Sequence, residues 1–420
     1  MPTFDPANIF MWAYNFLGWW LTSLGLAPEF ALFVQLFAAI GMLATTVLLI
    51  PIFTIWLERK IAGRFQDRIG PNRTGPYGLL QSFADVLKLL TKEDITPHKA
   101  DKWIFNLSPL FGVLSIITVW AVIPWASTMV GADINVGVLY LLGISGLGTI
   151  AIMMGGWSSN NKFALLGAFR AVAQLVAYEV PMIITLLIPV MLSGSMSLQS
   201  IVKAQGQMWF IVLAPFAGVL FFITSIAEIG RAPFDLLEAE SEIATGYNIE
   251  YTGMKFGVWM LQEFSHAFAV GPLFATFFLG GWHGPYATEI PVLGIVYFML
   301  KSFFGYFMII WVRSTLPRIR IDHLMSLNWK FFVPVSLLAL IVTALVDKAM
   351  SEFAPGAGVA GHAIVLFTAN VLLVISVIVW IRNAAHAARV KEEGDHEEGH
   401  DEHGDDASHD QHSAHLAPTH

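Results

Sequence analysis

The chain contains no cysteine among its 420 residues. Without thiolates it cannot by itself hold a cysteine-bound zinc ion or an ordinary iron–sulfur cluster. Any electrons that pass near this chain must then be carried by another chain or by a diffusible molecule. The sequence also lacks a P-loop, so we do not expect it to use a nucleotide directly.

Charged residues are scarce as well. They make up 13% of the chain, whereas 56% of the residues are hydrophobic and the mean hydropathy is +0.64. This composition excludes a soluble globular domain and indicates an all-α polytopic membrane protein. The formal net charge of −8 is misleading, because ten acidic residues and no Lys or Arg follow Lys391, and the rest of the chain carries +2.

The first 30 residues contain no Lys or Arg, so a secretory signal with a charged start is not expected. Residues 1–30 are predicted to form an apolar segment at the membrane interface, because tryptophan-rich apolar helices often lie there; an additional span is the alternative. Residues 31–382 are predicted to form the transmembrane domain. Residues 383–420, rich in His, Asp and Glu, are predicted to be a disordered, solvated tail; metal chelation by the seven histidines from His396 to His420 is the alternative.

Nine apolar runs are long enough to cross a bilayer as helices. They lie at about 31–56, 104–125, 136–156, 171–192, 209–227, 256–281, 292–312, 331–346 and 363–381. Lys and Arg concentrate in alternate gaps between these runs, while the other gaps hold only Lys203 and Lys348. By the positive-inside rule the basic gaps face the cytoplasm, the N-terminus lies outside and the tail inside. We therefore predict a multi-pass protein of the cell inner membrane with about nine helices and structured cytoplasmic-side loops.

One segment between two of these runs, Ala227–Glu250, is strongly acidic. Against a single cation, Arg231, it carries Glu228, Asp235, Glu238, Glu240, Glu242 and Glu250. Acids flanked by membrane spans are costly unless they have a function. Pro233 and Asp235 suit the first turn of a short helix, which would place Asp235, Glu238 and Glu242 on one face. Because like charges repel, we expect some of these acids to be protonated, or paired with Arg231 or with an arginine of another loop.

A basic segment, Glu58–Lys102, is predicted to face the same side. Gly70-Pro71 and Gly75-Pro76 indicate a tight, irregular turn. Leu79–Thr91 follows with one apolar stripe, which indicates an amphipathic helix lying flat at the interface. On spacing alone, the simpler interpretation is an anchored surface helix with basic lipid contacts.

Four ionisable residues are predicted within membrane helices or at their ends: Glu179, Glu228, Glu263 and Lys301. At 1.5 Å per residue, Glu179 and Glu263 lie ~12 Å and ~10 Å below the inner surface, and Lys301 lies ~18 Å below it. Such groups suit a proton relay, because desolvation and mutual pairing oppose each other in setting their charge. Structural ion pairing between helices is the alternative.

Three further polar residues accompany these helices. Gln174 and Tyr178 share a face with Arg170, and they form either a hydrogen-bonded path towards Glu179 or ordinary helix packing. His266 follows Glu263 by one turn, and we interpret it as a structural histidine with satisfied hydrogen bonds.

Four blocks of sequence make the chain recognisable. They are ERKIAGRFQDRIGPNRTGPYGLLQSFADVLKLLTKE (Glu58–Glu93), GWSSNNKFALLGAFRAVAQLVAYEVP (Gly156–Pro181), AEIGRAPFDLLEAESEIATGYNIEY (Ala227–Tyr251) and WVRSTLPRIRIDHLMSLNWKFFVP (Trp311–Pro334). In this order they resemble the inner-side segments of the H-type membrane subunit of respiratory complex I (the mitochondrial ND-one type), the proton-translocating NADH:quinone oxidoreductase. Residues 1–30 and the tail fall outside the resemblance.

The resemblance implies that the chain joins the membrane arm to the peripheral arm and forms the membrane-side wall of a quinone chamber. It implies a quinone substrate, ubiquinone or menaquinone, reduced by electrons from an iron–sulfur cluster of a partner chain, and no covalently bound cofactor. The implied partners are peripheral-arm iron–sulfur and quinone-site subunits, adjacent small membrane subunits, antiporter-like subunits and the lipid bilayer, but not nucleic acid. This chain alone would then have no redox activity.

The resemblance also implies site residues. Those matching the family's quinone chamber are Arg59, Gln66, Arg68, Phe83 and Asp85, and those matching its acidic proton path are Glu179, Glu228, Glu238, Glu242, Glu250 and Glu263. We add Asp235 and Lys301 to the path. We place Arg231, Arg313 and Arg318 beside the chamber, where arginines would neutralise the acidic segment; positive-inside anchoring is the alternative for the last loop.

Two other functions stay open on sequence alone. A membrane subunit of an energy-converting hydrogenase-type complex would share the fold and some acids, but the intact GPNR and PFDLLEAE sequences disfavour it. An autonomous proton or ion transporter is disfavoured because the chain shows no inverted or tandem repeat.

Overall fold

The computed structural model describes residues 9–236, 246–353, 358–383 and 386. Every regular element within these residues is a helix, which confirms the predicted all-α fold. In chain order the elements are α1 (Ile9–Ser23), α2 (Pro28–Phe65), η1 (Pro76–Gly78), α3 (Gln81–Thr91), α4 (Lys102–Trp120), α5 (Gly137–Ser158), α6 (Lys162–Ser193), α7 (Leu198–Ala204), α8 (Phe210–Leu213), α9 (Pro215–Glu228), η2 (Gly246–Asn248), α10 (Gly253–Phe278), α11 (Pro291–Thr315), α12 (Ile321–Leu327), η3 (Asn328–Phe332), α13 (Val333–Phe353) and a final helix, Gly358–Asn383.

Each of the nine predicted spans coincides with helix. In the described part of the chain, seven helices are long and apolar enough to cross a membrane: α2, α4, α5, α6, α11, the continuous α12–α13 segment and the final helix. The sixth predicted span is α10, which has 26 residues but carries polar Gln262, Glu263 and His266. The fifth is divided into α8 and α9, because Pro215 lacks an N–H and forces Ala214 out of helical geometry (φ −134°, ψ 65°).

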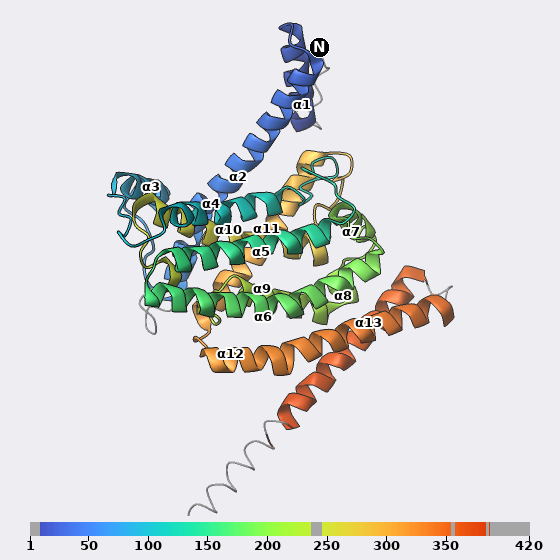
Figure 1. Ribbon diagram of the computed structural model, residues 1–420. Coiled ribbons are helices and arrows are strands. Elements are labelled where there is room, and N and C mark those ends of the chain that lie inside the picture. Colours follow the sequence, from blue (N-terminus) through green and yellow to red (C-terminus); the bar gives the residue numbers. More distant parts are fainter. Residues whose placement is uncertain (1–8, 237–245, 354–357, 384–385, 387–420) are drawn as a thin grey trace, which may run out of the picture.

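The loops gather at two ends of the bundle. Figure 1 shows α4, α5 and α6 running side by side, with α3 at one end and α7 at the other. At the α3 end, Asp101 N donates to Ser158 O at 3.0 Å and Ile319 N donates to Pro233 O at 2.9 Å. The α7 end is joined by bonds such as Val138 N to Met196 O at 3.0 Å. The predicted basic gaps all belong to the α3 end. The loops that are rich in Lys and Arg and the loops that are poor in them therefore lie at opposite ends of the bundle.

The core lies where α6, α9, α10 and α11 meet. Tyr178, Phe221, Phe268 and Tyr306 are buried there, each at most 1% exposed. Large apolar side chains also cover the outer faces of the helices, as at Leu300. Such faces are stable in lipid and not in water, so the protein crosses the membrane several times.

Helix α2 is longer than its apolar run. The run predicts an end near residue 56, but the helix continues to Phe65, so Glu58 and Arg59 lie on a helix and not in a loop. The added turns are rich in Leu, Arg, Lys and Glu, which are good helix formers once the chain leaves the hydrocarbon. At the other end of α2, α1 packs beside it (Figure 1), and Gln35 Nε2 donates to Tyr14 O at 2.8 Å.

The turn and the amphipathic helix predicted after α2 are confirmed. Gly75 and Gly78 have φ of +72° and +77°, values that side chains other than glycine rarely adopt. Helix α3 follows and exposes Phe83, Leu87 and Leu90 on one apolar side. This side is free to contact lipid or an apolar ligand.

The short helix predicted to begin at Pro233 is wrong within the described residues, where 231–236 form turns. Tertiary contacts take up the backbone carbonyls of this segment, since Ile319 N donates to Pro233 O and Gln174 Nε2 donates to Phe234 O at 2.7 Å. Carbonyls used in this way compete with a local helix. Glu238, Glu240 and Glu242 lie outside the described residues, as does the tail from residue 387.

Candidate functional site

Four charged side chains from separate segments meet at the α3 end. Glu58 of α2, Arg231 of the loop after α9, Glu263 of α10 and Arg313 of α11 form what we call the four-charge cluster. Arg231 Nη1 lies 2.9 Å from Glu263 Oε1 and 3.9 Å from Glu58 Oε1, and Arg313 Nη1 also pairs with Glu58 Oε1. Arg231 is 4% exposed and Glu58 is 6% exposed, so these two charges depend on their partners and not on solvent, whereas the Arg313 side chain is 34% exposed.

The cluster is formally neutral, which is what allows it to be buried. Two uncharged groups support it: the Tyr306 hydroxyl donates to Glu58 Oε2 at 2.9 Å, and the Arg231 guanidinium lies 4.7 Å above the Phe264 ring. Among the described residues, Arg231 Nε and Nη2 have no hydrogen-bond acceptor. The cluster therefore still has hydrogen-bonding capacity for another group.

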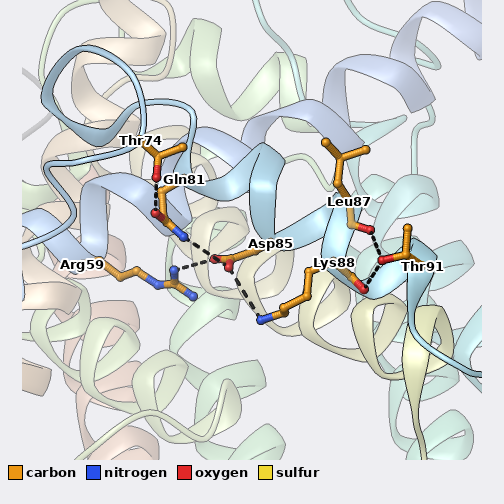
Figure 2. Close-up of polar contacts among 7 residues, drawn as sticks. All are labelled: Arg59, Thr74, Gln81, Asp85, Leu87, Lys88 and Thr91. Carbon is orange, nitrogen blue, oxygen red and sulfur yellow. Dashed lines mark hydrogen bonds and ion pairs between the residues drawn. The ribbon is translucent and has the colours of Figure 1, made fainter.

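A second polar group lies on the surface beside the cluster. Figure 2 shows Asp85 of α3 as its centre: Arg59 Nη1 is 2.7 Å from Asp85 Oδ2, Lys88 Nζ is 3.7 Å from Oδ1 and Gln81 Nε2 donates to Oδ1 at 3.4 Å. Thr74 in turn donates to Gln81 Oε1 at 2.8 Å. Arg59 and Asp85 keep 48% and 26% of their side chains exposed, so this group is accessible from outside the chain.

The other predicted chamber residues are arranged differently. Arg68 Nε donates to Gln66 Oε1 at 2.7 Å, so these two pair with each other. Phe83 is exposed on α3. The structure thus brings Arg59 and Asp85 together and leaves Gln66, Arg68 and Phe83 on the surrounding surface.

Helix α2 connects the buried cluster to this surface group. Glu58 and Arg59 are consecutive, and consecutive residues of an α-helix point about 100° apart. Glu58 therefore points into the bundle towards Arg231 and Arg313, whereas Arg59 points to Asp85 on α3. The surface group and the buried cluster are therefore only one residue apart along α2, so a change of charge in the surface group is felt electrostatically by the cluster.

The predicted acids of the membrane helices surround a cavity of about 110 Å³. Its polar lining includes Ser145, Ser225, Glu228, Gln262, Glu263 and His266. Ser145 Oγ donates to Glu179 Oε1 at 2.9 Å, so Glu179 adjoins the same space. The structure therefore places Glu228 and Glu263 on one cavity and Glu179 beside it, whereas Lys301, the fourth ionisable residue predicted with them, lies elsewhere.

Lys301 has a different environment. Its ammonium donates to the carbonyls of Gly281 at 3.0 Å and His283 at 2.8 Å, and it lies 4.6 Å above the Trp209 ring. These partners belong to the α7 end. Within the described chain Lys301 pairs with no carboxylate. Its place in the acidic path stays a prediction that no observed contact with an acidic residue supports. Burial, followed by the charge of Lys301, lowers the pKa of His283.

Glu250 also lies apart from the cavity. Asn161, which caps α6, donates to Glu250 Oε1 at 2.6 Å. The next residue, Tyr251, is buried and donates to Phe105 O at 3.1 Å, and burial raises the pKa of its hydroxyl. Glu250 therefore ties the loop before α10 to the start of α6.

The last loop reaches the acidic segment through its backbone. Ile319 N bonds Pro233 O, which places Arg318 next to the loop that holds half-buried Asp235. Helix α6 holds the same loop, because Gln174 Nε2 donates to Ala227 O and Phe234 O, both at 2.7 Å. Tyr178 donates to Leu324 O at 3.0 Å. Both side chains end on backbone carbonyls, which favours the packing interpretation over a hydrogen-bonded path to Glu179.

Two members of the site were not singled out from sequence. Glu58 begins the first recognisable block, but in the sequence it looks like the start of a basic loop, whereas α2 continues through it to Phe65. Tyr306 looks like any apolar-helix aromatic, although it precedes Arg313 by seven residues and so shares its face of α11. A carboxylate in the last turns of a membrane helix was the available signal for Glu58.

Comparison with known proteins assigns the chain to a family. A sequence profile described as NADH dehydrogenase matches residues 38–344. The H-type subunit of NADH-quinone oxidoreductase from Dehalococcoides mccartyi (strain CBDB1) is 47% identical over 313 residues, which cover 74% of this chain and 86% of that protein. The chain belongs to the NADH dehydrogenase family. The corresponding protein of Geobacillus sp. (strain WCH70) is 45% identical over 323 residues, 77% of this chain and 97% of that protein. That of Geobacter metallireducens is 45% identical over 315 residues, 73% and 94%.

Membership of the NADH dehydrogenase family confirms the resemblance drawn from the four blocks. It makes the chain a membrane subunit of an NADH:quinone oxidoreductase complex. The matched range, 38–344, contains all four recognisable blocks, the four-charge cluster and the cavity. No group of three or more His, Asp or Glu suited to a metal ion occurs in the described part of this NADH dehydrogenase chain; the tail histidines lie outside that part.

Proposed function

We propose that this subunit forms the membrane-side wall of a quinone-binding chamber and couples quinone reduction to proton translocation through its buried carboxylates. The quinone would approach along α3 and the Arg59–Asp85 pair. The proton path would include Glu179, Glu228 and Glu263 around the cavity, together with Asp235, Glu238 and Glu242 of the acidic segment. Glu250, Lys301, Gln66, Arg68, Phe83 and Arg318 stay proposed participants on the strength of the resemblance.

One observation carries this proposal: consecutive residues of α2 belong to the surface group and to the buried cluster. Charge that appears near Arg59 when a quinone takes up electrons acts on Glu58, Arg231 and Glu263. At a separation of about 10 Å and an effective dielectric constant near 20, one unit charge acts on another with ~1.7 kcal/mol. That changes the protonation equilibrium of a responsive carboxylate by roughly 20-fold. Quinone chemistry and proton uptake are thereby linked without a redox centre in this chain.

The partners follow from the same arrangement. A quinone beside α3 must receive electrons from iron–sulfur and quinone-site subunits docked at the α3 end, and protons leaving the cavity must pass to neighbouring membrane subunits. We propose residues 31–382 as the membrane domain of a cell inner membrane protein, flanked by the interfacial segment 1–30 and the tail 383–420. Ubiquinone and menaquinone both fit this scheme.

The sidedness of the α3 end is testable by labelling. Because Lys and Arg gather there, we expect the α3 end to face the cytoplasm. The natural chain lacks cysteine, so Asn72→Cys at this end and Glu289→Cys in the loop before α11 each introduce a single reactive site, and both positions are exposed. A membrane-impermeant thiol reagent should label Asn72→Cys only in inside-out vesicles and Glu289→Cys only in right-side-out vesicles. Labelling of both from the same side would contradict the topology.

The surface group provides the test of the quinone site. Exposed ion pairs contribute only about 0.2–1 kcal/mol to stability, so Arg59→Ala and Asp85→Asn should leave the complex assembled. We expect each to lower NADH:quinone reduction about tenfold, equivalent to ~1.4 kcal/mol of transition-state stabilisation. Electron transfer from NADH to an artificial acceptor of the peripheral arm should be unchanged.

The matched control is Lys348→Ala. Lys348 pairs with Glu352 at 2.9 Å, and both side chains are more than half exposed, so the substitution removes an exposed ion pair away from α3. It should leave both activities unchanged. If Arg59→Ala lowered the quinone and artificial-acceptor activities equally in assembled complex, the loop would not govern quinone access.

A further inference from the structure

The cavity beside Glu263 is lined by polar atoms that the protein itself does not satisfy. Ser225 Oγ, Glu228 Oε2 and Gln262 Oε1 are buried and have no hydrogen-bond partner in the described chain, although these residues are only 1%, 6% and 8% exposed. All three line the cavity. Buried polar groups are normally satisfied by protein or by water. A cavity of about 110 Å³ has room for several waters at ~30 Å³ each.

His266 lines the same cavity. It follows Glu263 by three residues on α10, so the two side chains share one face of the helix. Within the described residues the imidazole makes no hydrogen bond or ion pair with a protein group. The predicted satisfied hydrogen bonds of His266 are therefore not made by protein groups of the described chain. Its ring nitrogens are available to cavity water.

We propose that His266 is a proton-carrying group of a hydrated cavity, placed between the Glu263 carboxylate and the Glu228 carboxylate. The proposal rests on the proposed coupling function and adds a residue to it. Histidine suits this place because it accepts a proton at one ring nitrogen and releases the proton of the other, so one proton enters and one leaves. Water molecules in the cavity bridge the imidazole to each of the two carboxylates.

The groups around His266 set the charge that it experiences. Glu263 lies on its own helix, Glu228 comes from α9, and Glu179 comes from α6 behind Ser145. Tyr247 of η2 also lines the cavity, while α4 and α5 contribute only uncharged polar residues such as Ser115 and Thr149. Beyond Glu263 lie Arg231, Glu58 and Tyr306. Two carboxylates, Glu228 and Glu263, line the cavity with the imidazole, and a third, Glu179, lies behind Ser145, so a proton on His266 has acceptors from more than one helix.

The test uses the whole complex in membrane vesicles, with His266→Asn and His266→Gln. Both substitutions keep hydrogen-bonding capacity and remove a group that can accept and release a proton, and they are compared with the unaltered complex from about pH 5 to pH 8. NADH:quinone reduction and protons moved per NADH are measured across that range in amounts normalised to assembled complex. We expect coupled turnover to fall about tenfold, less than the ~10²–10⁴-fold of a direct catalytic acid or base because the water chain persists. The pH profile should lose one ionisation step.

The control is His98→Asn, since His98 is an exposed histidine of a loop at the α3 end; its pH profile should match that of the unaltered complex. An assembled His266 variant with an unaltered pH profile overturns the proposal. Failure of both variants to assemble also overturns it, because His266 would then be a structural residue. If His266 variants keep the profile while Glu263→Gln abolishes pumping, only this inference fails. If Glu263→Gln also leaves pumping intact, the coupling function itself fails.

Discussion

Arg231→Met is expected to destabilise the complex by about 3–5 kcal/mol, the usual cost of removing one partner from a buried ion pair. Arg231 is 4% exposed and lies 2.9 Å from the Glu263 carboxylate and 3.9 Å from that of Glu58. Methionine keeps much of the side-chain volume and none of the charge. Glu58 then keeps Arg313, but Glu263 loses the cation it is paired with.

The measurement is the thermal midpoint and yield of assembled complex, followed by native electrophoresis with NADH-dependent staining of the peripheral arm. Arg64→Met is the control, because Arg64 is an exposed arginine of α2 and such substitutions usually change stability by no more than ~0.5 kcal/mol. The double variant Arg231→Met with Glu263→Gln should recover part of the loss, since no uncompensated charge is left at that pair. Equal stability of Arg231→Met and Arg64→Met would show that the cluster does not hold the helices together.

Glu263→Gln is expected to leave the complex assembled and to lower proton translocation at least about tenfold, within the range that acid–base groups contribute. Glutamine preserves the shape of Glu263 and still accepts a hydrogen bond from Arg231, but it exchanges no proton. Because Glu263 lines the cavity with Glu228, and Glu179 adjoins it through Ser145, these acids should titrate together. Removing one changes the proton affinity of the others. If chemistry and pumping are tightly coupled, quinone reduction slows in parallel.

The measurement is protons moved per NADH oxidised, in vesicles normalised for assembled complex. Glu289→Gln is the matched control, because Glu289 is an exposed carboxylate at the α7 end and should tolerate the same chemical change. A structural role for Glu263 predicts poor assembly of Glu263→Gln instead. An assembled Glu263→Gln complex with unchanged turnover and pumping would remove Glu263 from the path.

The amino-acid sequence alone determined the membrane class, the approximate positions of the long apolar helices and the division of charge between the two ends. These features are local: apolar runs of about 20 residues must form helices in lipid, because the backbone has no other hydrogen-bond partners there. The turn at Gly75–Gly78 and the amphipathic helix α3 could also be predicted, because both depend on residues that are close together in the sequence. The family was readable because four long blocks occur in order.

Only the tertiary structure decided which charges meet. Glu58, Arg231, Glu263 and Arg313 come from four segments, and helix depth alone would have grouped Lys301 with the acids instead of with the Gly281 and His283 carbonyls. Likewise, the turn geometry of 231–236 follows from bonds to Gln174 and Ile319, which lie far away in sequence. Depth along a helix axis follows from counting residues, but the direction in which a side chain points, and the partner it finds there, depends on how the helices rotate and pack against one another.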